Sequence, residues 1–319
     1  MSPILKKMLN QSFPPEPTFS VDQIPNLSGQ VVVVTGGNTG IGYETAKAVL
    51  VKNAKVYIAC RSREKGRSAI ARLREETGKD AHFLKLDLSS FVSIEQSAQE
   101  FLSLERCLHI LFNNAGVMEP PIDQVTSEGY DLTVGTNAIG TYYFTTLLLP
   151  ALLAVAQDGH QKARIVNTSS FSSEQAPDMK KIDYSIFKGP NDTQRKKLGT
   201  GDIYSASKWM NIAFATEFSR RYGNKGIVST SCSPGFIRTE LQRHWTGPRA
   251  WVANYLLRPT PYGALTQLYA GASVNADEFD GQYFIPWARK SEPNPTARDP
   301  VEGKRLWEWF EAQVPKKHV

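Results

Sequence analysis

The sequence predicts an α/β protein built on one doubly wound parallel β-sheet of seven strands, with helices on both faces. The first observation is the run Val31-Val32-Val33-Val34, which is apolar and β-branched throughout, as expected of a strand buried on both faces of such a sheet. The second is that similar runs alternate with helix-like segments at the pace of βαβ units. The third is size, because 319 residues with 41% apolar side chains supply enough surface for a large core.

The first strand leads directly into a glycine-rich turn, residues 35–42 (TGGNTGIG), and then into a helix-like segment at 43–50. Glycines permit a tight turn and close approach of the backbone, while a helix N-terminus offers unpaired N–H groups to a phosphate. The spacing G-x-x-x-G-x-G differs from the G-x-G-x-x-G dinucleotide pattern, and a tight turn without a ligand is the alternative. The flanking strand and helix favour a Rossmann-type diphosphate site formed by Gly36, Asn38, Thr39, Gly40 and Ile41.

The second strand, at 54–60, ends at the position that sets cofactor preference in dinucleotide folds. An acid there binds the ribose 2′-hydroxyl of NAD, whereas a basic group accommodates the 2′-phosphate of NADP. Here Cys60 and Arg61 occupy the junction, and Arg63 and Lys65 add to the local positive charge. The sequence therefore predicts NADP(H), with a solvated basic loop as the alternative.

Five further strands are expected along the chain. The third, at 82–88, ends in Asp87 and Leu88, and Asp87 could hydrogen-bond an adenine. The fourth, at 108–112, runs into Asn113-Asn114-Ala115-Gly116, and the fifth, at 164–170, ends in Ser169 and Ser170. The sixth and seventh are expected at 227–232 and 281–285. Ligands bind at the carboxyl edge of such sheets, so the residues that end these strands are candidates for the site.

Tyr204 and Lys208 stand four residues apart in a segment with helical character, so that phenol and ammonium lie on one face, one turn apart. A neighbouring positive charge favours the phenolate, and we therefore expect Lys208 to lower the pKa of Tyr204 and make it a usable proton donor. A packed tyrosine beside a solvated lysine is the alternative reading of this common spacing.

Several short patterns, in one order along residues 30 to 240, together resemble the short-chain dehydrogenase/reductase family. They are Thr35-Gly36-x-x-x-Gly40-Ile41-Gly42, Asn113-Asn114-Ala115-Gly116, Asn137, Ser170, Tyr204-x-x-x-Lys208, and Ser233-Pro234-Gly235 followed by Thr239. Within the family, Ala59-Cys60-Arg61 and the residues around Tyr204 look most like NADP-preferring retinol dehydrogenase-like members. The segment Pro17 to Ser20 is also shared with similar fungal carbonyl reductases.

The resemblance implies a role for each matching residue. Tyr204 would be the catalytic acid/base, Lys208 would lower its pKa and bind the nicotinamide ribose, and Ser170 would hold the substrate oxygen. Asn137, in an apolar helical stretch, would hold a water that links Lys208 to solvent, whereas the residue pattern alone also allows an amide that only caps or bonds the backbone. The remaining cofactor contacts would be Asn114, Ala115, Gly116, Pro234, Gly235, Ile237 and Thr239.

The activity implied is NADPH-dependent reduction of a lipophilic or aromatic aldehyde or ketone to the alcohol. One alternative is a dehydrogenase of a lipophilic alcohol, retinol- or sterol-like. The other is a non-catalytic NADP-sensing protein on the same fold, which would have no need of Ser170, Tyr204 and Lys208 together.

The expected organisation is an N-terminal arm (1–29), a catalytic domain (30–290) and a C-terminal tail (291–319). Within the domain, a mostly polar inserted loop is expected at 171–203 and a substrate lid at 240–261. His244, Trp245, Trp251 and Tyr255 gather in the second segment, and its aromatic residues could wall an apolar pocket or, as the alternative, belong to the core. A short amphipathic helix in the tail, around residues 306–310, could dock on the domain, on a partner subunit or on a membrane surface.

Composition narrows the partners and the compartment. A net charge of +6 without long basic runs argues against nucleic acid, and three distant Cys with five scattered His show no metal-ligand spacing. Neither a secretory signal nor an apolar stretch long enough to span a membrane is visible. We expect a cytoplasmic monomer or homodimer without a metal, acting on a small molecule, with peripheral membrane contact left open.

Overall fold

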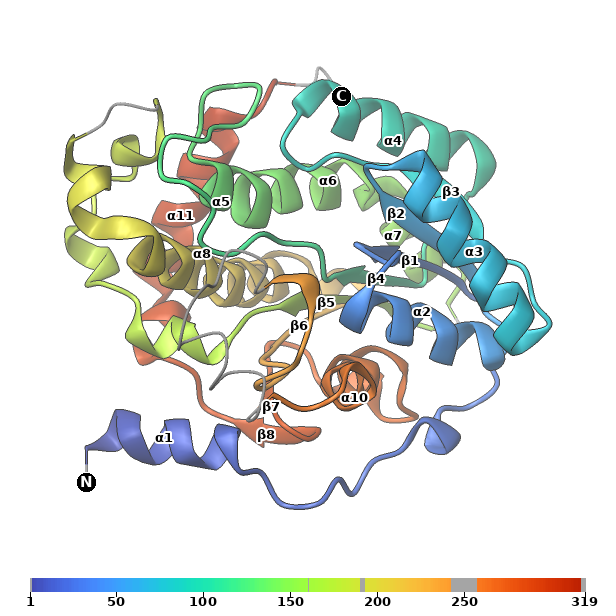
Figure 1. Cartoon of the computed structure of the whole chain (residues 1–319). Helices are drawn as coiled ribbons and strands as arrows, with labels where there is room; N and C mark the ends of the chain where they lie inside the picture. Colours follow the sequence, from blue (N-terminus) through green and yellow to red (C-terminus); the bar gives the residue numbers. More distant parts are fainter. Residues whose placement is uncertain (1, 160, 190–192, 242–256, 317–319) are drawn as a thin grey trace.

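Eight strands form one sheet in the computed structural model, in the order β3-β2-β1-β4-β5-β6-β7-β8 (Figure 1). The structure describes residues 2–159, 161–189, 193–241 and 257–316. The strands are β1 (Val31–Thr35), β2 (Lys55–Cys60), β3 (His82–Lys85), β4 (Ile110–Asn113), β5 (Ala163–Thr168), β6 (Ile227–Cys232), β7 (Tyr283–Ile285) and β8 (Arg289–Ser291).

The seven expected strands are all present and parallel, but the count of seven was wrong because β8 pairs antiparallel with β7. The eighth strand has only three residues, Arg289, Lys290 and Ser291, and follows β7 after a turn of three residues. It carries no apolar alternation, so nothing in its pattern distinguishes it from a polar loop.

The helices cover both faces of the sheet. They are α1 (Pro3–Ser12), α2 (Gly40–Val51), α3 (Arg63–Thr77), α4 (Phe91–Leu104), α5 (Leu132–Val134), α6 (Thr141–Leu147), α7 (Leu149–Gln157), α8 (Thr193–Tyr222), α10 (Thr260–Ala272) and α11 (Pro300–Gln313). Val31 and Val33 of β1 face a core shared with α4, α6, α7, α8 and α11. Val32 and Val34 face the opposite core, formed with α2, α3 and α10 (Figure 1). The alternation within one strand thus confirms the doubly wound architecture.

β1 is flanked by β2 on one side and β4 on the other, so the direction of winding reverses between β1 and β4. Open α/β sheets bind ligands outside the carboxyl ends of their strands at such a reversal. The glycine-rich turn follows β1, and the Asn113-Asn114-Ala115-Gly116 segment follows β4. Both therefore flank the same crevice.

The C-terminal tail docks on the chain's own domain. Trp307 of α11 stacks on Phe214 of α8 with ring centroids 6.1 Å apart, and Phe310 lies 5.0 Å from Tyr142 of α6. Both α11 rings are nearly inaccessible to solvent. The tail helix is therefore part of the core.

Residues 171–189 and 193–203 differ from the expected polar loop. They form the short 3₁₀ helices η3 (Phe171–Gln175), η4 (Met179–Lys181) and η5 (Tyr184–Phe187) and then the first turns of α8. Met179, Tyr184 and Phe187 are buried, and Arg305 of α11 donates a hydrogen bond to the Tyr184 hydroxyl at 3.0 Å. Tertiary contact with the tail buries side chains that are too widely spaced to form a periodic pattern.

Two remaining expectations concern the lid and the membrane. His244, Trp245, Trp251 and Tyr255 of the expected lid lie outside the described residues. Among the described residues, no single helix has both the length and the hydropathy to cross a membrane, although the bent pair Leu132–Leu147 and Leu149–Gln157 together has both.

Candidate functional site

A cavity of about 720 Å³ lies at the carboxyl edge of the sheet and extends from the glycine-rich turn to Tyr204 and Lys208. Asn137 and Arg63, which were expected to contribute to the site, do not line it. The predicted residues that do are Gly36, Asn38, Thr39, Gly40, Ile41, Arg61, Asp87, Leu88, Asn114, Ala115, Gly116, Ser170, Tyr204, Lys208, Pro234, Gly235, Ile237 and Thr239. Residues from six loops and from α8, expected from sequence patterns and from the family resemblance, thus meet at one place.

The glycine-rich turn has the backbone conformation that a diphosphate site needs. Gly36 and Gly40 have φ values of +67° and +57°, in the left-handed region that favours glycine. A Cβ on Gly42 would collide with the Gly36 carbonyl oxygen and the Asn114 side chain. α2 begins at Gly40, so its unpaired N–H groups lie at the cavity wall. The turn therefore fits the pyrophosphate of a dinucleotide.

Thr35 ties the two halves of this crevice together. Its hydroxyl accepts hydrogen bonds from the backbone N–H groups of Asn114 and Ala115, each at 3.0 Å. The Asn114 side-chain amide donates in turn to the Thr35 carbonyl oxygen at 2.9 Å. Sequence reasoning noted Thr35 only as part of a motif, and its position as the last residue of a buried strand was the available signal.

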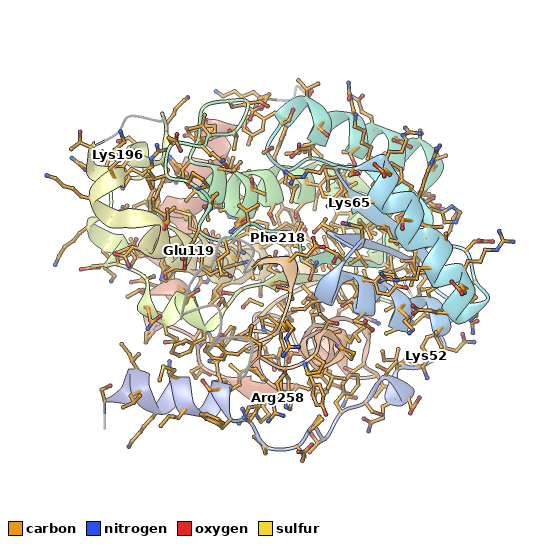
Figure 2. The ribbon with its side chains drawn as sticks, viewed as in Figure 1. Lys52, Lys65, Glu119, Lys196, Phe218 and Arg258 are labelled. Carbon is orange, nitrogen blue, oxygen red and sulfur yellow. The ribbon has the colours of Figure 1, made fainter. Side chains whose placement is uncertain are left out.

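The far end of the cavity carries positive charge and one acid. Arg61 and Lys65 both line it, and Lys65 is labelled on α3 in Figure 2. Arg63, which was expected to contribute, instead places its guanidinium 5.7 Å from the centre of the Phe83 ring and is not part of the lining. The Asp87 carboxylate accepts hydrogen bonds from the Ser89 backbone and hydroxyl, at 3.0 and 2.6 Å. The positive charge at this end of the cavity thus comes from Arg61 and Lys65.

Asn137 is fully buried behind the cavity, on a π-helical turn, Gly135–Gly140, that links α5 to α6. Its Oδ1 accepts from the Val117 N–H at 2.8 Å, and its Nδ2 donates to the Val117 carbonyl at 2.9 Å and to the Ser207 hydroxyl at 3.1 Å. Asn137 therefore clamps the loop after β4 to α8. Val117 and Ser207 were not predicted as its partners.

Tyr204 and Lys208 lie one turn apart on α8, with 7% and 4% of their surfaces exposed. The Lys208 Nζ donates to the Thr168 carbonyl oxygen at 2.9 Å and lies 5.7 Å from the Tyr204 ring centre. Burial lowers the pKa of Lys208 to about 8.

The phenol does not behave as the spacing suggested. Burial raises the pKa of Tyr204 above its ordinary value, the Ser170 hydroxyl lowers it in part, and the charge of Glu119 raises it further. The expectation of a lowered pKa for Tyr204 is therefore wrong, because loss of solvation dominates and Lys208 is not among the groups that shift the pKa of this phenol. The phenol is therefore protonated across the physiological range.

The two serines after β5 do different things. The Ser169 hydroxyl is buried and donates to the Lys208 carbonyl oxygen at 2.7 Å, inside the protein framework. Ser170 is the N-cap of η3, where its hydroxyl accepts from the Ser172 N–H at 3.2 Å and also interacts with the Tyr204 side chain. Ser170 is thus the serine whose hydroxyl faces the phenol.

Several lining residues near Tyr204 were missed. Phe171 and Phe236 form an aromatic wall with ring centroids 6.2 Å apart, and each is adjacent to a predicted site residue, which was the available signal. Glu119, labelled in Figure 2, and Asp202 carried no signal, because neither belongs to a recognisable motif. The other lining residues at this end include Met118, Gln175, Ser205, Leu241 and Leu257.

A protein-family model and several individual proteins are similar to this chain. A family model described as short chain dehydrogenase matches residues 30–188. A short-chain dehydrogenase/reductase of Armillaria gallica is 51% identical over 306 residues, which are 96% of this chain and 97% of the relative. Retinol dehydrogenase 11 of Homo sapiens is 34% identical over 314 residues, which are 96% of this chain and 90% of the relative.

Solved structures share the fold at lower identity. An uncharacterised protein of Mycobacterium paratuberculosis superposes with a TM-score of 0.70 and 22% identity, covering 92% of this chain and 97% of that one. The RhlG protein of Pseudomonas aeruginosa, solved as a complex with NADP, has a TM-score of 0.64 and 23% identity, covering 82% and 95%.

Proposed function

Because the chain belongs to the short-chain dehydrogenase/reductase family, we propose that it reduces a lipophilic or aromatic aldehyde or ketone to the alcohol, with NADPH as the reductant. One observation carries the proposal. Ser170, Tyr204 and Lys208 line the same cavity as the glycine-rich turn and Arg61, so that a proton donor and a dinucleotide site share one enclosed space. A protein that only sensed the dinucleotide would have no need of a buried phenol there.

When bound, NADPH supplies the hydride that reaches the carbonyl carbon. The chain supplies the proton and the orientation. The Ser170 hydroxyl holds the carbonyl oxygen beside the phenol, and Tyr204 donates its proton to that oxygen as the C–H bond forms. The resulting phenolate takes a proton back by way of Lys208, whose pKa of about 8 suits the exchange of a proton with solvent.

The preference for NADPH rests on charge at the far end of the cavity. Arg61 and Lys65 line the position where the 2′-phosphate would lie, and the junction after β2 carries Cys60 and Arg61 in place of an acid. A guanidinium matches a phosphate dianion in shape and charge.

The proposal of a lipophilic substrate is based on the residues that line the cavity near Tyr204. Met118, Phe171, Phe236 and Leu257 line this end and present apolar surface to a ligand. The relative named retinol dehydrogenase 11 favours a second candidate, the reverse reaction on a lipophilic alcohol. The free thiols Cys60, Cys107 and Cys232 support a reducing compartment, and we propose a cytoplasmic monomer or homodimer.

The test is a panel of aliphatic and aromatic aldehydes, ketones and quinones, followed by the loss of NADPH absorbance. The matched alcohols are assayed with NADP⁺, and NADPH binding is measured separately. Faster carbonyl reduction than alcohol oxidation supports the proposal, and the reverse order favours the alcohol dehydrogenase. Tight NADPH binding without turnover of any compound would identify a binding protein instead.

A further inference from the structure

The N-terminal helix α1 lies beside the edge strand β8 and away from β1, the strand that follows it in the sequence (Figure 1). Its end is fastened there by Arg289 of β8, which donates to the Asn10 side chain at 2.7 Å and to the Asn10 carbonyl at 2.9 Å. The helix was not expected, since the arm reads as polar and Pro-rich. Its other contacts reach two loops that border the candidate site.

The first contact is an ion pair with η3. The Lys7 ammonium lies 2.9 Å from Glu174 Oε2, and the side chains are 36% and 5% exposed. Lys7 also donates to the Glu292 carbonyl at 3.2 Å. The other Glu174 oxygen, Oε1, has no hydrogen-bond partner among the described residues. The Lys7 ammonium is therefore the main group that stabilises the buried Glu174 carboxylate.

The second contact reaches the segment after β6. The Ser233 hydroxyl donates to Gln11 Oε1 at 2.7 Å, and both side chains are almost completely buried. Ser233 is followed directly by Pro234 and Gly235, which line the cavity. Gln11 and Ser233 are 222 residues apart, so this bond joins the first helix to the far end of the domain.

η3 is the element that sets the position of Ser170. The Ser173 hydroxyl and backbone N–H both bond the Ser170 carbonyl oxygen, at 2.7 and 3.1 Å. The Ser170 hydroxyl in turn caps the Ser172 N–H at 3.2 Å. Glu174 follows Ser173 directly, so a shift of the Glu174 carboxylate moves the turn that holds Ser170.

From these contacts we propose that α1 is a brace for the active site, in which Lys7 is a positioning residue for Ser170 and Gln11 one for the segment at 233–235. The proposal rests on the proposed function, because it assumes that Ser170 holds a substrate oxygen. Without the Lys7 ammonium the buried Glu174 carboxylate loses its ion-pair partner and must move towards water, and η3 moves with it. A displacement of the order of 1 Å at a substrate-orienting group is enough to slow a reaction severely.

The test uses the full-length chain and four variants. Lys7→Met removes the ammonium and keeps most of the stem, and Lys7→Arg restores a cation. Gln11→Leu removes the partner of Ser233. Lys6→Met is the matched control, because Lys6 is the exposed neighbour on the same helix. Melting temperature confirms that each variant is folded.

Three quantities are measured: kcat/KM for the best carbonyl, the Kd for NADPH, and hydrogen–deuterium exchange of peptides covering 171–175 and 233–237. We expect Lys7→Met to lower kcat/KM about tenfold with the Kd within about twofold. Exchange should rise at 171–175 in Lys7→Met and at 233–237 in Gln11→Leu. Lys7→Arg should recover most of the loss, and Lys6→Met should match the parent protein.

A double-mutant cycle separates positioning from general destabilisation. If Lys7 acts through Ser170, Lys7→Met costs little more once Ser170→Ala is present, whereas an unrelated defect costs the same factor in both backgrounds. Equal losses, full activity of Lys7→Met, or unchanged exchange at 171–175 would each overturn the proposal. If the parent protein reduces no carbonyl, the proposed function fails, and exchange alone then decides whether α1 braces η3.

Discussion

The Lys208 ammonium donates its hydrogen bond to the Thr168 carbonyl oxygen and lies 5.7 Å from the centre of the Tyr204 ring. Both groups are enclosed, and enclosure moves their pKa values towards the neutral forms, up for Tyr204 and down to about 8 for Lys208. The site without a ligand therefore holds a protonated phenol beside an amine that exchanges its proton near neutral pH. This is a suitable resting state for a proton donor.

The phenol itself gives the first prediction. Tyr204→Phe removes the proposed proton donor but keeps the buried aromatic ring on α8, so we expect turnover to fall at least about a hundredfold while the Kd for NADPH changes little. Steady-state NADPH oxidation and NADPH fluorescence titration measure the two quantities. Turnover near the parent rate in Tyr204→Phe would remove Tyr204 from the mechanism.

The buried lysine gives a prediction about stability. The pKa of Lys208 is about 8 in the folded chain and about 10.5 when unfolded, so between these values the unfolded chain binds more protons and stability rises with pH. Below pH 8 the folded chain buries Lys208 as a charged ammonium, and the full free-energy cost of that burial lowers the stability of the fold. We expect Lys208→Met to be more stable than the parent at pH 7, by the order of 1–3 kcal/mol, because Asn211 still donates to the Thr168 carbonyl at 3.1 Å.

The measurement is urea unfolding of both proteins at pH 7 and pH 10, without cofactor. The advantage of Lys208→Met should shrink at the higher pH, where the folded lysine has lost its proton. An advantage that is the same at both values would show that burial does not lower the pKa of Lys208.

Sequence patterns predicted the parts of this protein that depend on local chemistry. Four consecutive valines indicated a central strand, and the glycine spacing indicated a turn in which Gly36 and Gly40 adopt positive φ. The spacing of Tyr204 and Lys208 placed them on one face of a helix. It could not show that β5 and the loops around it would enclose both groups, so the direction of the Tyr204 pKa shift was missed.

Contacts between distant segments were not predictable in this way. Ser233 and Gln11 are 222 residues apart, and neither residue type is unusual where it stands. β8 has no apolar residue to form a pattern, whereas α1 carries Ile4, Leu5, Met8 and Leu9 at helical spacing, a signal that was overlooked in a Pro-rich segment. The lining residues Glu119 and Asp202 were missed because tertiary structure alone brings them to the cavity.

Cofactor preference gives a third prediction. Arg61→Asp replaces the cation that we assign to the 2′-phosphate with a repelling carboxylate, so the KM for NADPH should rise at least about tenfold and that for NADH should change little or fall. Arg67→Asp is the matched control, since Arg67 is an exposed arginine of α3 that does not line the cavity. An equal effect of both variants on the KM for NADPH would show that Arg61 contributes only general positive charge and no specific contact with the 2′-phosphate.

Asn137 gives a fourth prediction, which separates two roles. If it clamps the loop after β4, Asn137→Ala leaves both polar groups of the Val117 backbone without their partner and lowers the free energy of unfolding by about 1–3 kcal/mol. Asn137→Asp keeps the acceptor for the Val117 N–H and should lose less. A residue that only held a relay water would leave the denaturation midpoint unchanged in Asn137→Ala, so urea unfolding of the two variants decides.

The glycine-rich turn gives the last prediction. A Cβ at Gly42 would meet the Gly36 carbonyl and the Asn114 side chain, and the backbone of the turn would have to move to make room. Moving it displaces the α2 N–H groups that we assign to the phosphates, so Gly42→Ala should weaken NADPH binding at least about tenfold and destabilise the fold by about 1–3 kcal/mol. Gly201→Ala controls for the melting temperature, because nothing lies within 4 Å of a Cβ on helical Gly201 and the change should stabilise slightly. Normal NADPH affinity in Gly42→Ala would show that the dinucleotide does not depend on this turn.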